Sequence, residues 1–104
     1  MRTALIATAL ASLTLLGACA GTTEHWTMPN FVTNPPTNLQ DAQNKLQDLG
    51  HGSIETSSHD ATAADREQAN DRDWVVCQQS VKPGDQVTEE DSVDFVVVKV
   101  GEKC

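Results

Sequence analysis

The chain has 104 residues, 38% of them hydrophobic, and its 7 Lys and Arg against 15 Asp and Glu give a formal net charge of −8. This length holds at most one small domain. Because the sequence is acidic and has no cluster of Lys and Arg, it lacks the basic patch that binding to nucleic-acid phosphates requires. We therefore expect no nucleic-acid partner.

The N-terminal segment has the organisation of an export signal. Met1 and Arg2 precede an apolar run from Ala4 to Leu16, which is too short to span a bilayer as a permanent helix. The run ends in Leu16-Gly17-Ala18-Cys19, a branched apolar residue and two small residues directly before a cysteine. This sequence resembles a bacterial lipobox.

The lipobox resemblance implies that residues 1–18 are a lipoprotein signal peptide and that Cys19 becomes the lipidated first residue of the mature protein. Two or more acyl chains hold a protein stably on a membrane, since each buried CH₂ contributes roughly 0.8 kcal/mol. We expect a lipid-anchored protein on the extracytoplasmic face of the cell membrane. The alternative is an ordinary secretory signal, because Ala18-Cys19-Ala20 also has the small residues of a cleavage site.

The cysteines predict one disulfide. If Cys19 carries lipid, Cys77 and Cys104 remain as an even pair in an oxidising compartment. A bond between them would close a loop of about 27 residues and stabilise the fold by roughly 3–4 kcal/mol. A metal pair or a reactive thiol is the alternative, which the absence of a CxxC motif and of ordered histidine spacing disfavours.

The start of the mature chain predicts a tether and a short strand. Residues 19–27 are mostly small and polar, and Trp26 within them would rest on the domain or at the membrane interface. The domain is expected over residues 28–104. Its first element is a short edge strand over Met28–Val32, where Pro29 is tolerated at an edge, and Asn34-Pro35-Pro36 then interrupts the chain.

A helix is predicted to start near Thr37, because Thr37-Asn38-Leu39-Gln40 fits a capping box. Four apolar side chains follow at helical spacing and form one stripe; they are Leu39, Ala42, Leu46 and Leu49. Gly50 is expected to end the helix in a left-handed conformation.

The second half of the chain predicts strands separated by a solvated loop. A short, half-buried strand is expected over His51–Ser57, and the 58–73 segment has almost no apolar side chain larger than Ala. Trp74–Ser80 and Val93–Val100 have β-rich composition and are separated by a turn at Lys82–Asp85. The expected fold class is α+β, with one helix packed on a small antiparallel sheet of about three strands.

The order of these elements resembles the PASTA domain, which occurs outside bacterial membranes on penicillin-binding proteins and serine/threonine kinases. The features that carry the resemblance lie between Met28 and Gly101; they are Met28-Pro29-Asn30-Phe31-Val32, the Ala42, Leu46 and Gly50 spacing, Val76-Cys77-Gln78-Gln79-Ser80 before Pro83-Gly84, and the closing Val93–Val100 strand. The chain departs from the family pattern at Val81, where a proline is expected, at Thr33–Pro36, in the 58–73 insertion and in its cysteine pair.

The resemblance implies a non-catalytic module that recognises peptidoglycan stem peptides or β-lactams. Because such domains usually occur in tandem arrays, a single copy is expected to bind weakly. Contacts are expected from the sheet face and the following turn, through Gln78, Gln79, Ser80 and Lys82. The alternative is a protein-interaction lipoprotein that modulates a membrane protein, a kinase ectodomain or a phage component. Trp74 is expected in the core in either case, as are Phe31 and Phe95.

The remaining polar residues point to neither an enzyme nor a cofactor site. His25, His51 and His59 are scattered, and His59 and Asp60 are expected in an exposed loop. No Gly-x-Ser-x-Gly or Ser-x-x-Lys motif occurs. The aspartates of the 58–73 segment lack the spacing of a calcium loop, so no metal or other cofactor is expected.

Overall fold

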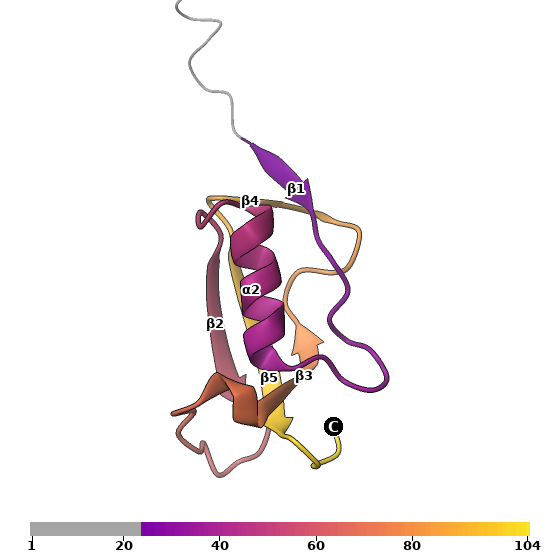
Figure 1. Ribbon diagram of the computed structural model, residues 1–104, viewed down its shortest axis with the longest axis vertical. Coiled ribbons are helices and arrows are strands. Elements are labelled where there is room, and N and C mark those ends of the chain that lie inside the picture. Colours follow the sequence, from indigo (N-terminus) through magenta and orange to yellow (C-terminus); the bar gives the residue numbers. More distant parts are fainter. Residues whose placement is uncertain (1–23) are drawn as a thin grey trace, which may run out of the picture.

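The computed structural model describes residues 24–104, so the predicted signal peptide and Cys19 lie outside the described residues. The elements follow one another as β1 (His25–Thr27), α2 (Leu39–Leu49), β2 (Glu55–Asp60), a 3₁₀ turn η2 (Asp71–Asp73), β3 (Trp74–Gln79), β4 (Gln86–Thr88) and β5 (Ser92–Lys99). The fold is a small α+β fold, as predicted, with α2 packed over the sheet and running along β2 and β5 (Figure 1).

The strands form two sheets. β1 and β4 are an antiparallel pair, and the larger sheet has the order β2-β5-β3. Within the larger sheet β3 is antiparallel to β5, but β2 is parallel to it, so the prediction of an antiparallel sheet was wrong. β5 is the central strand of this sheet. It is the longest strand and is rich in valine, as expected for a strand that is covered by a neighbour on each edge.

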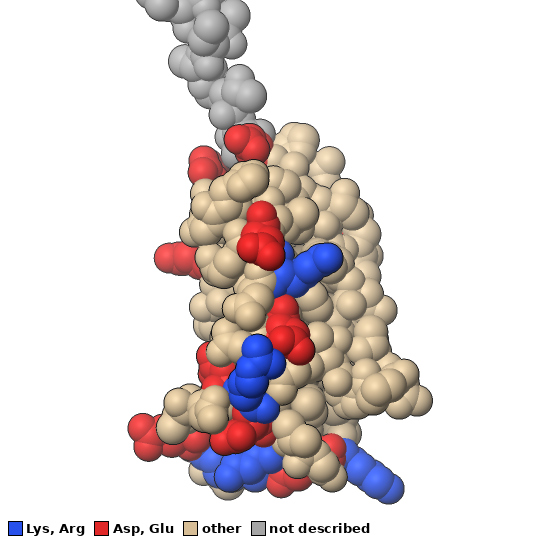
Figure 2. All heavy atoms as spheres, in the orientation of Figure 1, with Lys and Arg blue, Asp and Glu red and all other residues tan. Residues whose placement is uncertain are grey.

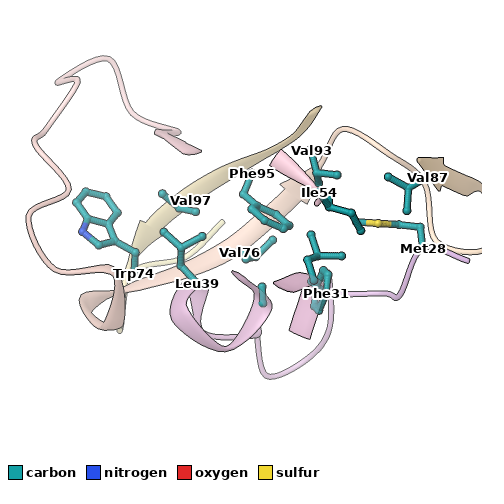
Figure 3. Packing of buried hydrophobic residues seen from close by; sticks show 12 residues of the cluster. Met28, Phe31, Leu39, Ile54, Trp74, Val76, Val87, Val93, Phe95 and Val97 are labelled. Carbon is teal, nitrogen blue, oxygen red and sulfur yellow. The ribbon is translucent and has the colours of Figure 1, made fainter. Parts of the chain in front are cut away.

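The helix packs its predicted stripe on this sheet. Leu39, Ala42 and Leu46 are buried, and Leu49 is partly buried against the same cluster. They meet the inward side chains of β3 and β5, and Trp74 and Met28 lie at opposite ends of this core (Figure 3). The core also includes Phe31, Ile54, Val76, Val87, Val93, Phe95 and Val97. The predicted core positions of Trp74, Phe31 and Phe95 are therefore confirmed.

The N-cap of α2 is Asn38, and the prediction of Thr37 was wrong by one residue. The Asn38 side chain accepts a hydrogen bond from the Gln40 amide, as an N-cap requires. Thr37 belongs instead to the extended segment before the helix, because its carbonyl accepts a hydrogen bond from the Val76 amide.

Gly50 ends the helix, but not in the left-handed conformation that was predicted. Its φ is −99°, whereas His51 and Gly52 have φ of 53° and 82°. A Cβ at position 50 would lie 2.6 Å from Cγ1 of Ile54. Close packing against Ile54 therefore explains the glycine at this position.

The first strand begins earlier in the chain than predicted. β1 covers His25–Thr27 within the segment expected to be a tether, and Met28–Val32 is not a strand. Trp26 of β1 lies opposite the buried Val87 of β4 and packs against the core. Burial of this aromatic side chain favours pairing at residues 25–27.

The second strand begins later than predicted and runs further, so the start of the 58–73 segment is not loop. β2 covers Glu55–Asp60, and the buried Ile54 precedes it. The rest of the segment is irregular until η2, and Asp60 is buried where an exposed residue was expected.

Candidate binding surface

The face of the larger sheet opposite α2 is open except at one end, where the paired Val75 and Val98 are buried outside the main core. Side chains alternate along a strand, and Val93, Phe95 and Val97 enter the core, so Asp94 and Val96 lie on the opposite face. The strand register places further residues beside them, with Ser57 opposite Asp94 and both His59 and Gln78 opposite Val96. We call this surface the outer face; its residues are Glu55, Ser57, His59, Gln78, Ser80, Asp94 and Val96.

The carboxylate of Asp94 is at the centre of the outer face. The Ser57 hydroxyl donates to its Oδ1 over 2.8 Å, and His59 Nδ1 lies 2.9 Å from its Oδ2. The Asp94 backbone N–H donates to Ser80 Oγ over 2.8 Å. These contacts fix the position of the carboxylate, while its side chain remains 35% exposed.

The arrangement suits binding better than nucleophilic chemistry. In a catalytic triad the imidazole lies between the hydroxyl and the carboxylate and takes the hydroxyl proton. Here the Ser57 hydroxyl donates to the carboxylate itself. Residues 24–104 also enclose no pocket, so a ligand would meet an open surface. A positioned, accessible carboxylate can pair with an ammonium group, and the neighbouring hydroxyls and amide can form hydrogen bonds.

The four residues expected to contact a ligand do not share one surface. Gln78 and Ser80 are exposed on the outer face, and Lys82 is exposed in the turn that follows β3. Gln79 points the other way. Its Oε1 accepts from the Phe31 amide, and its Nε2 donates to the carbonyls of Pro29 and Val81. Because its amide is occupied within the fold, we leave Gln79 out of the candidate surface.

A second polar cluster holds the opposite end of the sheet together. The buried carboxylate of Asp60 accepts bonds from Arg66 Nε and Nη2 and from the backbone N–H groups of Thr62 and Arg66. The same guanidinium makes two bonds to Glu102, of 3.0 and 2.9 Å. It also lies 5.2 Å from the centre of the Trp74 ring. The cluster therefore ties the loop after β2 to the C-terminal segment.

The charges in this cluster stabilise one another. The Arg66 guanidinium holds the pKa of Asp60 well below its usual range, although burial acts in the opposite direction. Its bonds also lower the pKa of Glu102. In return, the hydrogen bonds from Asp60 and Glu102 raise the pKa of Arg66. Every member already has a partner, so this cluster is structural.

Cys77 and Cys104 form a disulfide with a Cα–Cα distance of 5.5 Å, in agreement with the pairing expected from the sequence. A β-bulge lies between Val76 and Gln78, so Cys77 is the extra residue on β3. The C-terminal segment turns back at Gly101, whose φ is 93°, to reach it. The bond fixes that segment beside the outer face.

No group of three or more His, Cys, Asp or Glu side chains within residues 24–104 could hold a metal ion. Among the helices over the same residues, none is both long and apolar enough to cross a membrane.

Comparison with known proteins gives no relative. The sequence matches no protein-family model, and it has no significant match among curated proteins or solved structures.

Sequence reasoning missed the centre of the outer face. Ser57 and Asp94 are 37 residues apart, and they meet only because β2 pairs with β5 in parallel. After Ile54 every residue of β2 is polar, so no alternation in the sequence could have extended the strand to His59 and Asp60.

Proposed function

We propose that this protein is a non-catalytic, lipid-anchored envelope protein whose single PASTA-like domain binds peptidoglycan stem peptides. The observation that carries the proposal is the fixed, accessible carboxylate of Asp94 on an open polar sheet face. Stem peptides offer what this face can bind, namely backbone amide groups and an amine on the diamino acid. A disulfide and an α+β fold with one helix are compatible with an exported domain of this kind.

The binding is expected to be weak. Each exposed hydrogen bond contributes about 0.5–1.5 kcal/mol, and the surface has no pocket that would exclude water. A few such bonds correspond to dissociation constants in roughly the millimolar to high-micromolar range. Attachment to the membrane would compensate for this weakness by holding the domain close to the cell wall.

Co-sedimentation with purified peptidoglycan tests the proposal. The full-length protein should sediment with peptidoglycan, and Asp94→Asn should reduce the bound fraction. Asp48→Asn is the matched control, since Asp48 is an exposed aspartate of α2, away from the outer face. Equal binding of the two variants, or no binding by the wild type, would contradict the proposal. Capture of an envelope protein in place of peptidoglycan would favour the protein-interaction alternative.

The anchor is tested separately. Leu16-Gly17-Ala18-Cys19 motivates the expectation that Cys19→Ser leaves the protein unprocessed or releases it from the membrane fraction. Loss of the acyl chains removes on the order of ten kcal/mol or more of lipid burial. A Cys19→Ser protein that is processed and membrane-bound like the wild type would show that Cys19 is not the anchor.

A further inference from the structure

The two edges of the larger sheet differ in how they are covered. The edge of β3 pairs with the chain's own N-terminal segment, because Asn38 forms a bridge with Val75 and the Val76 amide donates to Thr37. Further along the same edge, Gln79 bonds to the backbone of Pro29 and Phe31. This edge has no room for another strand.

The edge of β2 is open. β2 is the outermost strand of the sheet, on the opposite side from β3 (Figure 1). The Ala61 amide donates to Val97 of β5, and alternate residues of a parallel strand face the same neighbour, so the amides of Thr56 and Ser58 face outward. Within residues 24–104, no hydrogen bond occupies the outward backbone groups of these two residues.

The open edge carries only part of the usual protection against strand addition. It has no lysine, proline or bulge and pairs with β5 without interruption, whereas Glu55 is negatively charged and the Asp60 carboxylate points inward at the end of the strand. Two copies of this chain, each with a formal charge of −8, repel one another. An added strand is therefore favoured from a partner that brings positive charge.

The neighbourhood of the edge indicates where that charge would lie. A strand beside β2 would place alternate side chains next to the outer-face residues Glu55, Ser57 and His59. The Glu55 side chain is exposed, and within residues 24–104 it forms no hydrogen bond or ion pair. An amine-bearing side chain in an added strand can reach the Glu55 carboxylate. A second carboxylate, that of Asp94, lies on the neighbouring strand β5.

From these features we infer that β2 receives an extended peptide by strand addition, with the peptide's backbone on the Thr56 and Ser58 amides and its ammonium group beside Glu55. This inference rests on the proposed function, because the peptide class it names is the amine-bearing stem peptide. It adds the mode of binding, which is strand addition to β2. Backbone pairing gives the affinity, and the Glu55 carboxylate selects peptides that carry an amine.

Thr56→Pro is the most direct variant for a test. Proline removes the outward amide of position 56 but leaves the β2–β5 hydrogen bonds, and prolines are accepted on edge strands. Thr56→Val is the matched control, because it keeps the amide and the shape of the side chain. Glu55→Gln tests the carboxylate, with Glu89→Gln in the β4–β5 connection as its control.

The experiment is an NMR titration of the full-length protein in lipid nanodiscs with a synthetic stem pentapeptide that has a free amine on its third residue. We expect amide exchange at Thr56 and Ser58 to slow several-fold near saturation. Thr56→Pro and Glu55→Gln should each weaken binding about 3- to 10-fold, the effect of one lost hydrogen bond or ion pair. Both control variants should bind like the wild type, and acetylation of the peptide amine should mimic Glu55→Gln.

Two results would overturn the inference, and they differ in their consequence. Shifts on the outer face without slower exchange at Thr56 and Ser58 would exclude strand addition but leave the proposed function intact. No shifts anywhere with millimolar peptide would contradict the proposed function, and the inference with it. The exchange measurement on the wild type decides the question even if Thr56→Pro fails to fold.

Discussion

Two neighbouring glutamines of β3 have opposite roles. Gln78 is exposed on the outer face, whereas the Gln79 amide bonds to three backbone groups. Replacement of Gln79 by leucine would leave these groups without partners, so we expect the free energy of unfolding to fall by about 1–3 kcal/mol. Gln78→Leu should change it by about 0.5 kcal/mol or less. Urea denaturation measures both, and equal effects would contradict the structural role of Gln79.

The Asp60 cluster predicts a specific loss of stability in acid. Because the pKa of Asp60 is lower in the folded protein than in the unfolded chain, its ion pair stabilises the fold fully above the unfolded value near pH 4, and this contribution is lost as the pH falls further. The stability difference between the wild type and Arg66→Met should therefore be full at pH 7 and shrink below about pH 4.

Arg72→Met is the matched control for this measurement. Arg72 pairs with Asp41 at the surface, where both side chains are more than half exposed, so its replacement should have little effect at any pH. Thermal denaturation between pH 7 and pH 2.5 compares the variants. A difference between the wild type and Arg66→Met that is independent of pH would show that Arg66 acts through packing on Trp74 and not through the Asp60 charge.

The residues of the outer face were predictable only in part. Gln78 and Ser80 follow a recognisable β-rich run, so their place on a sheet could be inferred from local sequence. The meeting of Ser57 with Asp94 depends on a long-range parallel pairing, for which no local pattern exists. Both Gln78 and Gln79 were expected to contact a ligand, but the bulge at Cys77 leaves Gln78 on the outer face and turns Gln79 toward the inner side of the sheet.

At the level of elements, the turn from α2 to β2 depends on the contact between Gly50 and Ile54. A methyl group at position 50 would overlap Ile54, so Gly50→Ala should destabilise the protein by about 1–3 kcal/mol. Ile54→Ala should cost about 2–5 kcal/mol. Because the smaller side chain makes room for the methyl group, the double variant should be less destabilised than the sum by about 1 kcal/mol or more. Additive effects in urea denaturation would contradict the contact.

The helix was predictable, whereas the second strand was predictable only in part, because its bounds leave no mark in the sequence. Leu39, Ala42 and Leu46 repeat with the helical period, and this pattern alone identifies the buried face. β2 contains no residue larger than Thr on its inner side before the buried Asp60, so it has no apolar pattern to recognise. Its place in the sheet follows from pairing with the apolar β5.

For the whole molecule, the disulfide between Cys77 and Cys104 is the main covalent constraint on the unfolded chain. It closes a loop with a sequence separation of 27 residues, so its removal in Cys77→Ala/Cys104→Ala should lower the free energy of unfolding by about 3–4 kcal/mol. Denaturation of the oxidised wild type and the double variant measures the difference. Equal stability of the two proteins would contradict this role.

The central claim is that the outer face around Asp94 binds stem peptides, and a chemical-shift map of the full-length protein with a soluble muropeptide tests it most directly. Weak binding still moves amide resonances in proportion to occupancy. The account predicts saturable shifts at Ser57, His59, Gln78, Ser80 and Asp94, with Asp94→Asn weakening them and Asp48→Asn leaving them unchanged. Shifts confined to α2 or to the Asp60 cluster, or no shifts with millimolar muropeptide, would contradict it.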